Sequence, residues 1–256
     1  MDSRAITVPA AKLEPALRRF ELRRIRLPIG KETISLVVPD AREWIRRGEW
    51  TPATEQGAEP PYWCQVWPAS IAAARLLARS HELAGKRVLD LGCGLGVPGI
   101  VAARAGARTT FADLQADALA FAGWNASRHA TSDPPQVLQT DWSRDTLADL
   151  FDVIVLADVS YRPVHHLALQ RHLEACLDAH GVVVHADPMR REATPFVRWL
   201  ETQYPAAVLM RSTSFEHRTL DVRLCVASRN ADVVARWVAA SGTGASVAAR
   251  GGPVDG

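Results

Sequence analysis

A run of glycines near residue 90 is the part of the sequence best suited to binding a ligand. Residues 88–96 are VLDLGCGLG, and Pro98 then opens a run with helical periodicity. Glycine lets the backbone approach a ligand closely, and the first turn of a helix offers free N–H donors. The run therefore predicts a strand, a tight turn and a helix start that hold a nucleotide-like molecule.

The glycines alone are compatible with two ligands. They match the dinucleotide pattern GxGxxG at Gly94, Gly96 and Gly99. Asp113 then lies at about the spacing of a ribose contact, but the strand would have to continue past Gly92, whereas the apolar run stops at Leu91. Asp90, inside the strand end, would repel the pyrophosphate of NAD and suits the sulfonium and ammonium groups of S-adenosylmethionine. Charge thus favours S-adenosylmethionine, with an NAD-binding oxidoreductase as the alternative.

Acidic residues also follow the later apolar runs. Asp113 ends the second run, Asp141 with Trp142 follows the third, and Asp158 follows the fourth, three residues before Tyr161. A single Asp after a strand is often a turn former or a helix cap. Open α/β sheets, however, bind ligands at the carboxyl ends of their strands, so acids on successive strands predict one binding edge.

The elements that must position these residues alternate from residue 87 onward. Apolar runs predict strands over 87–91, 109–112, 136–139, 153–157 and 182–186. Helical periodicity lies between them, over 98–105, 119–126 and 163–179. Residues 208–210 and 219–226, joined by a loop at 213–218, add an antiparallel edge. The fold class is therefore a doubly wound, Rossmann-like α/β sheet of seven mostly parallel strands, with helices on both faces.

The ends of the chain depart from this pattern. Residues 1–18 show little periodicity and predict a loosely docked arm. A β-hairpin is expected around the turn at 28–31, a connecting loop over 49–62, and a helix from Pro68. Residues 241–256 predict a disordered tail. The expected division is an arm and hairpin (1–59), a main domain (60–228), and a C-terminal helix and tail (229–256).

The composition excludes several classes of protein. With 256 residues, 48% apolar, and a formal net charge of +2, the chain can bury a sizeable core and lacks the basic excess of a nucleic-acid binder. No apolar stretch approaches the ~18 residues of a membrane span, so we expect a cytoplasmic protein that binds neither membrane nor nucleic acid. The four cysteines are far apart, which predicts free thiols and no metal site. His165, His166 and His172 are expected on the exposed side of a helix.

The strand-borne acid followed by GxGxG resembles the signature of class I, seven-β-strand methyltransferases. The resemblance covers about residues 60–227 and implies S-adenosylmethionine as the cofactor. It implies cofactor contacts for the acid and glycines of the first turn: Asp90, Gly92, Gly94 and Gly96. It also implies that Asp113 contacts the ribose, and that Asp141 with Trp142 contacts the adenine.

A narrower resemblance rests on the segments PPYWCQVWP, over 60–68, and DVSY, over 158–161. Together they are similar to the lysine methyltransferase-like group that includes the electron-transfer flavoprotein β-subunit lysine methyltransferases and bacterial relatives. This implies that Trp67 borders the cofactor pocket and that Asp158 and Tyr161 lie at the substrate mouth. The PAS segment after Trp67 differs from the glycine-rich version of some bacterial members, and the N-terminal arm has no match.

The expected reaction is methylation of a lysine side chain of a protein. Attack on a sulfonium methyl group needs alignment more than a strong base, because the sulfonium charge and desolvation both depress the pKa of the amine. Asp158 could accept an N–H of the amine, Tyr161 could add its ring or hydroxyl, and Asp187 is a weaker second candidate. The alternatives are a methyltransferase for a small amine or pyridine, which a compact closed pocket would favour, and a non-catalytic nucleotide-binding module.

Overall fold

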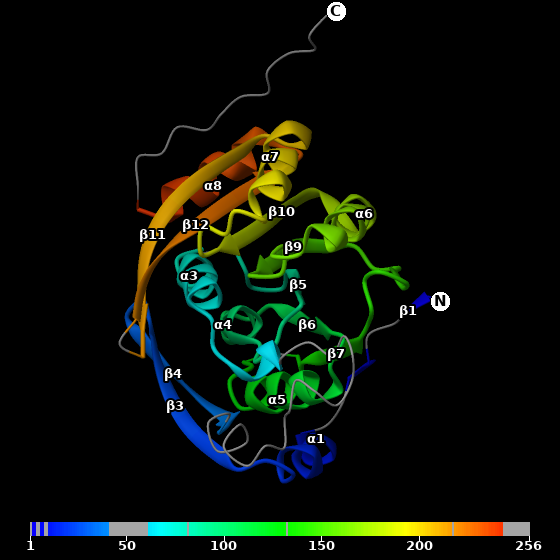
Figure 1. Cartoon of the computed structure of the whole chain (residues 1–256), viewed down its shortest axis with the longest axis vertical. Coiled ribbons are helices and arrows are strands. Elements are labelled where there is room, and N and C mark those ends of the chain that lie inside the picture. Colours follow the sequence, from blue (N-terminus) through cyan, green and yellow to red (C-terminus); the bar gives the residue numbers. More distant parts are fainter. Residues whose placement is uncertain are drawn as a thin grey trace, which may run out of the picture.

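The strands predicted from the apolar runs pair into one sheet. The computed structural model describes residues 2–3, 6–7, 10–40, 61–80, 82–131, 133–216 and 218–242. The main sheet has the order β11-β12-β10-β9-β5-β6-β7-β2 (Figure 1). These strands are β2 (Ile6–Thr7), β5 (Arg87–Leu91), β6 (Arg108–Asp113), β7 (Gln136–Gln139), β9 (Phe151–Ala157), β10 (Leu177–Asp187), β11 (Ala206–Phe215) and β12 (Arg218–Ser228). The strands from β10 to β7 are parallel, and β12 is antiparallel to both neighbours, so the predicted fold class is confirmed.

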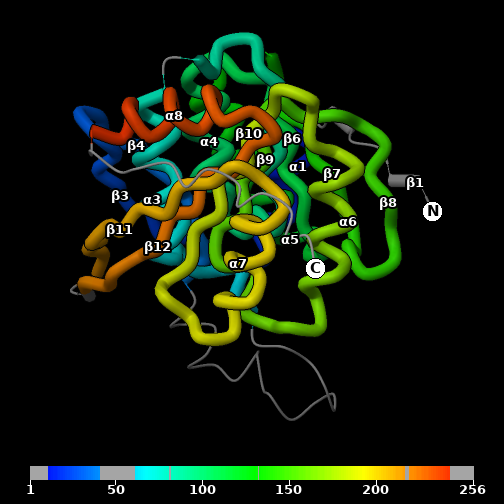
Figure 2. The backbone as a smooth tube through the Cα atoms, turned by 90° about the horizontal axis from the view of Figure 1, so that it is seen from above, coloured from blue at the N-terminus to red at the C-terminus, as the bar shows by residue number. Residues whose placement is uncertain are grey.

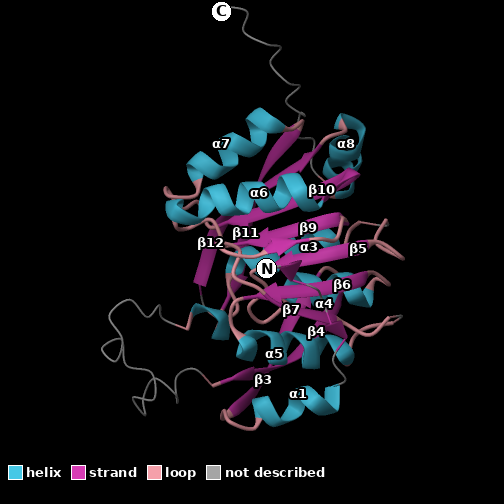
Figure 3. Ribbon diagram, turned by 90° about the vertical axis from the view of Figure 1, so that its right-hand side faces the viewer, coloured by secondary structure: helices cyan, strands magenta, loops and turns pink. Residues whose placement is uncertain are grey.

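Helices cover both faces of this sheet. One core includes α3 (Pro68–Leu77), α4 (Val97–Arg104), α5 (Ala116–Ser127) and α8 (Ala231–Ala240). The other includes α6 (His166–Cys176) and α7 (Thr194–Gln203). The central strands lie side by side between these cores (Figure 3), and in β9 Val153 and Val155 enter the first core while Ile154 and Leu156 enter the second. Burial on both faces explains why the central strands are nearly continuous apolar runs.

The described residues of the N-terminal segment are attached to the domain, which corrects the loosely docked arm expected over 1–18. In α1 (Ala10–Leu17), Leu13 and Leu17 lie four residues apart on one helical face and are buried against the core that contains α5. β2 pairs with β7 and adds an eighth strand to the sheet. β1 (Asp2–Ser3) pairs with β8 (Thr146–Leu147).

The predicted hairpin forms a third layer outside the helices. β3 (Leu22–Ile29) and β4 (Glu32–Pro39) are antiparallel around a two-residue turn that contains Gly30. Asn125 of α5 clamps the main chain of Val37, accepting its N–H and donating to its carbonyl, both at 2.8 Å. The hairpin is thereby fixed on the α3 side of the molecule, away from α6 and β8 (Figure 2).

Several boundaries differ from the prediction. The helix expected over 163–179 begins with a 3-10 turn (Pro163–His165) and ends at Cys176, because Leu177 already pairs with Phe151. The loop expected over 213–218 is shorter, because β11 runs to Phe215. Most of the expected loop 49–62, as well as the tail from residue 243, lies outside the described residues.

The histidines of α6 are another correction, because His166 and His172 are buried instead of exposed. His166 Nε2 hydrogen-bonds the carbonyl of Ser160, and His172 Nδ1 that of Ala168, each at 2.9 Å. A histidine with a carbonyl partner can therefore share the buried face of a helix with leucines.

None of the helices in the described part of the chain has the length and apolar character that a bilayer crossing demands.

Candidate active site

The turn between β5 and α4 requires its glycines. Gly92, Gly94 and Gly96 have positive φ values of 71°, 52° and 73°, a region that glycine adopts without strain. A Cβ added at Gly92 would lie only 2.5 Å from Cγ1 of Val159. The N–H of Gly94 donates to Oδ2 of Asp113 at 2.9 Å. The tight turn expected from the glycine run is therefore present.

Asp90 lies beneath this turn and is not among the residues that line the pocket. Its side chain is buried, and its Oδ2 accepts the N–H of Gly99, in the first turn of α4, at 2.9 Å. Burial raises the pKa of Asp90 to about 7, because the charged form loses its hydration. In the structure Asp90 anchors α4 to the strand, and its expected contact with a cationic ligand stays a prediction.

Asp113 ends β6 at the pocket wall. Its Oδ2 accepts the N–H of Gly94 and its Oδ1 that of Gln115, both at 2.9 Å. Burial raises the pKa of Asp113, and these two donors oppose the rise. Each carboxylate oxygen keeps a second lone pair, so Asp113 could also accept the hydroxyls of a ribose.

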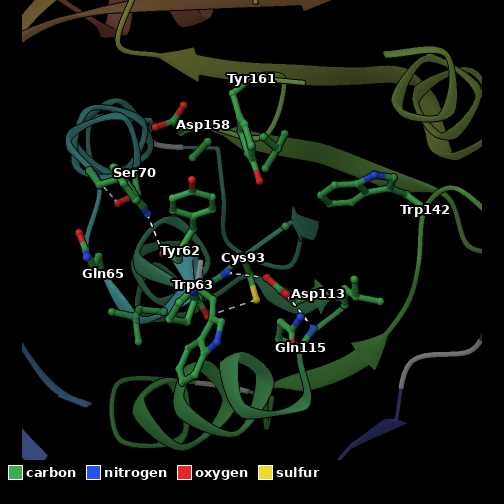
Figure 4. Close-up of a pocket in the computed structure, with 18 of the residues that line it drawn as sticks. Tyr62, Trp63, Gln65, Ser70, Cys93, Asp113, Gln115, Trp142, Asp158 and Tyr161 are labelled. Carbon is green, nitrogen blue, oxygen red and sulfur yellow. Dashed lines mark hydrogen bonds between the residues drawn. The ribbon is translucent and has the colours of Figure 1, made fainter. Parts of the chain in front are cut away.

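A pocket of about 690 Å³ opens beside the glycine turn, a volume typical of small-molecule sites. Of the residues singled out from the sequence, the structure brings eight into its lining: Trp67, Gly92, Gly94, Asp113, Asp141, Trp142, Asp158 and Tyr161. Asp158 and Tyr161 lie at one end, and Asp113 with Gln115 lies toward the other (Figure 4). Gly96 lies outside the lining, where a Cβ would come within 2.8 Å of Ala122.

Asp141 and Trp142 follow β7 and form a side wall. Asp141 Oδ1 accepts hydrogen bonds from the hydroxyl and the N–H of Ser143, at 2.6 and 2.9 Å, and the bond from the hydroxyl is the largest cause that lowers the pKa of Asp141. The ring of Trp142 packs edge-on against His165, with centroids 5.7 Å apart. This wall therefore combines an ionised acid with an aromatic face.

Three aromatic rings meet where α3 begins. The ring of Tyr62 lies 6.0 Å from that of Trp67 and 5.9 Å from that of Tyr161, both edge-to-face. Trp67 is fixed by a 2.9 Å hydrogen bond from its Nε1 to the carbonyl of Tyr62. Tyr62 was not predicted as a site residue, although the aromatic-rich PPYWCQVWP segment contains it.

Asp158 is paired with an arginine that the sequence did not reveal. Its two carboxylate oxygens accept hydrogen bonds from Nε and Nη2 of Arg190, at 2.6 and 2.8 Å. The Asp158 side chain is 4% exposed and that of Arg190 35%. The substrate mouth implied for Asp158 therefore contains an ion pair. Its partner Arg190 ends the ADPMR segment after the fifth apolar run.

A buried polar network lies behind this pair. Asp187 accepts two hydrogen bonds from Arg223, at 2.9 and 3.1 Å, and is wholly buried outside the pocket lining. The second role suggested for Asp187, in binding the amine, is therefore wrong. Ser160 Oγ hydrogen-bonds Nε2 of His185 at 2.8 Å, which ties the DVSY segment to β10.

The charged side chains of the pocket suit S-adenosylmethionine better than a dinucleotide. Four carboxylates occur among the described lining residues, whereas Arg162 is the single arginine there. Asp158 is paired with Arg190 and Asp117 with Arg19, but acids still outnumber arginines in the lining, which opposes a pyrophosphate and favours a sulfonium or ammonium group. In the described ranges no three His, Cys, Asp or Glu side chains gather closely enough to hold a metal ion, and the four cysteines are free and buried.

Comparison with known proteins points to one family. The family model described as lysine methyltransferase matches residues 53–203. The chain is 32% identical over 162 residues to the electron transfer flavoprotein beta subunit lysine methyltransferase of Danio rerio, covering 62% of this chain and 60% of that protein. It is 32% identical over 174 residues to the protein N-terminal and lysine N-methyltransferase efm7 of Emericella nidulans, covering 57% and 63%. The chain thus spans about three fifths of the length of these relatives.

A solved structure is also similar. The magnesium protoporphyrin IX methyltransferase of Synechocystis PCC 6803, with bound SAH, has a TM-score of 0.52 at 17% identity. The match covers 73% of this chain and 98% of that one. At this level of identity the likeness concerns the fold, and it agrees with the Rossmann-like sheet described above.

Proposed function

The chain belongs to the lysine methyltransferase family, and we propose that it transfers the methyl group of S-adenosylmethionine to the side-chain amine of a lysine in a protein. The observation that carries this proposal is the layout of the pocket. The glycine turn and Asp113 line one part, while Asp158 and Tyr161 line the other (Figure 4). The first part suits a nucleoside and the second an amine, so a methyl group held between them would face its acceptor.

The nucleoside part would be held by residues already fixed in place. Asp113 would accept the ribose hydroxyls, Trp142 and Asp141 would border the adenine, and the backbone of Gly92 and Gly94 would let the ligand approach the strand end. When bound, S-adenosylmethionine supplies a methyl group on a cationic sulfur, and the N–C bond forms as the C–S bond breaks with its electron pair left on sulfur.

The chain itself has to deliver a neutral amine in line with the methyl group. A free lysine has a pKa of ~10.4, so removing its proton at pH 7 costs about 4–5 kcal/mol. The rings of Tyr62, Trp67 and Tyr161 would exclude water from the amine, and desolvation lowers the pKa of a lysine. Asp158 would accept one N–H and so aim the lone pair at the methyl carbon. No strong base is needed, because the proton leaves to solvent before transfer.

The protein acceptor is supported by the relatives, whose names state that they act on protein lysines. One observation favours a second candidate, methylation of a small free amine. Arg190 neutralises Asp158, so the mouth lacks the free acid that would attract a lysine from an open protein surface. The size of the labelled product separates the two candidates.

The test is methyl transfer from labelled S-adenosylmethionine in a lysate of the source cell, with calorimetry of the purified protein against S-adenosylmethionine and NAD. We expect binding of S-adenosylmethionine and a labelled protein band whose modified residue is lysine. The Asp158→Asn variant should label that band at least about 100-fold more slowly, with its affinity for S-adenosylmethionine within about threefold of wild type. Asn tolerates the φ of +58° at this position.

The matched control is Asp149→Asn, an exposed acid outside the pocket lining, which should label like wild type. Label found only in small molecules would favour the second candidate. Binding of NAD without binding of S-adenosylmethionine would overturn both.

A further inference from the structure

The ion pair at the pocket mouth is built to persist. The Nε and Nη2 groups of Arg190 face the two oxygens of Asp158 in a fork at 2.6 and 2.8 Å, the strongest geometry for such a pair. Because the Asp158 side chain is almost completely buried, separating the pair would strand a charge away from water. Displacement of Arg190 by an incoming amine is therefore strongly opposed.

The backbone N–H and carbonyl of Arg190 are also both hydrogen-bonded. Its N–H donates to Oδ1 of Asp187 at 2.9 Å, and its carbonyl accepts the hydroxyl of Thr194 at 3.4 Å. Asp187 is itself locked by the two bonds from Arg223. Arg190 is thus placed by a chain of hydrogen bonds that starts at the buried Arg223 of β12.

The guanidinium lies among the aromatic residues of the mouth. Its carbon is 5.9 Å from the ring centroid of Trp67 and 5.9 Å from that of Tyr161, within range of a cation–π contact. The rings that would surround the acceptor amine thus already contact a permanent cation.

From this geometry we infer that Arg190 is a positioning residue that cancels the charge of Asp158, so that the acceptor lysine enters as a neutral amine and is not trapped as an ammonium ion. The inference rests on the proposed function. Each oxygen of Asp158 retains a lone pair after pairing with the fork, so the carboxylate can still accept an N–H and orient the amine. An unpaired carboxylate within about 4–6 Å would instead raise the pKa of the amine by about 1–3 pH units.

Other titratable groups face the same site and must be accounted for. Burial raises the pKa of Tyr161 and lowers that of His165, and Arg223 neutralises Asp187. The remaining ones in the described lining are Tyr62, Cys93, Asp113, Asp117, Asp141 and Arg162. All of them are common to wild type and to variants of Arg190, so a change in pH profile reports the pair itself.

The experiment measures kcat from pH 6 to 10 with labelled S-adenosylmethionine and the protein that the wild-type enzyme labels in lysate, purified and at saturating concentration. At saturation kcat reports ionisation in the bound complex. We expect Arg190→Gln to move the acid limb of the profile about 1–3 pH units toward alkaline pH. Its kcat at pH 7 then falls at least about tenfold, while kcat at pH 10 stays within a few-fold of wild type.

Two further variants test whether the charge balance of the Arg190–Asp158 pair causes the shift of the acid limb. Arg190→Lys keeps the charge but cannot reproduce the two-bond fork, so its acid limb should lie between those of wild type and Arg190→Gln. Asp158→Asn leaves the cation unpaired and should move the limb toward acid pH at a lower maximum rate, so the sign of the effect is testable even if Arg190→Gln does not fold. Arg191→Gln, at an exposed neighbouring arginine, is the matched control and should leave the profile unchanged.

Several outcomes overturn the inference. One is an Arg190→Gln variant whose kcat has the same pH dependence as that of wild type, whatever its maximum kcat. Another is an Arg190→Gln variant that is folded but inactive at every pH. A third is faster methylation at pH 7, which would make Arg190 a latch that the substrate displaces. A wild-type enzyme that methylates no lysine defeats the proposed function instead, so the two failures are distinguishable.

Discussion

At the scale of single residues, Asp90 and Asp113 show how a buried acid can shape a site through the backbone groups that it holds. Both are buried and both accept backbone N–H groups, of Gly99 and of Gly94 with Gln115. Burial raises the pKa of Asp90 to about 7, so its charge is only partly present at neutral pH. The negative charge available to a cationic ligand comes instead from the acids that line the pocket.

Gly94 permits the sharpest test of the glycine turn. A valine there would have to adopt the φ of +52°, which is costly for a β-branched residue, and its Cβ would lie 3.4 Å from the carbonyl oxygen of Trp63. We expect Gly94→Val to weaken S-adenosylmethionine binding at least about 100-fold by calorimetry. Gly30→Val is the control, because Gly30 has a φ of +62° in the hairpin turn with open space around it. Equal affinities in the two variants would show that the turn does not hold the ligand.

At the scale of elements, a buried histidine of β10 holds the DVSY segment, which follows β9 and contributes to the site. His185 of β10 bonds Ser160, its Nδ1 has no hydrogen-bond partner in the described structure, and Asp187 Oδ2 lies 3.9 Å away. Burial lowers the pKa of His185 to about 4, which outweighs the opposite influence of Asp187, while Arg223 and His166 lower it further. The neutral ring is therefore the form that the fold stabilises.

This shift predicts a pH dependence of stability. In the unfolded chain His185 titrates near 6.5, so its contribution is complete above that pH and is lost as the pH falls toward 4, where the folded form also takes up a proton. We expect the free energy of unfolding of wild type to fall between pH 7 and pH 5 by about 2 kcal/mol more than that of His185→Gln. Denaturant titrations at both pH values measure this difference. The raised pKa of Asp90 makes the fold more stable as the pH falls, but equally in wild type and in His185→Gln. The same pH dependence of stability in the two proteins would therefore contradict the role assigned to His185.

The hairpin packs its apolar face into the core and is also hydrogen-bonded to Asn125 of α5. Removing the side chain of Asn125 leaves the N–H and the carbonyl of Val37 without their partners in a partly buried position. We expect Asn125→Ala to reduce the free energy of unfolding by about 2–3 kcal/mol. Asn230→Ala, which removes an exposed cap of α8, should cost only about 1 kcal/mol. Similar losses in the two variants, measured by urea titration, would show that the clamp is unimportant.

The elements were more predictable than the contacts between them. Apolar runs sufficed to predict β5, β6, β7, β9 and β10, because both faces of these strands are apolar. A two-residue strand such as β2 has no period to detect. The partner of Asp158 lies 32 residues away along the chain, and its choice depends on how the segments after β9 and β10 converge, which a local pattern does not encode.

At the scale of the whole molecule, the pocket joins segments from most of the domain. Its walls come from 61–70, 92–97, 113–117, 140–143 and 157–165. Each segment follows or precedes a different strand or helix, and the sheet positions them together with contacts between the segments, such as that of Tyr62 with Tyr161. A ligand that contacts all of them therefore stabilises the entire domain against unfolding.

This coupling predicts a thermal response that depends on the identity of the ligand. At 100 times its dissociation constant, a ligand specific for the folded state adds about 2.7 kcal/mol, which for a chain of this size corresponds to about 5–10 °C in Tm. We expect S-adenosylmethionine to produce such a rise and NAD at the same concentration to produce none, since NAD would bring its pyrophosphate among the acids of the pocket. Differential scanning calorimetry measures both, with Gly94→Val as the protein in which the rise should disappear. A rise with NAD alone, or an equal rise with both ligands, would contradict the charge argument on which the choice of cofactor rests.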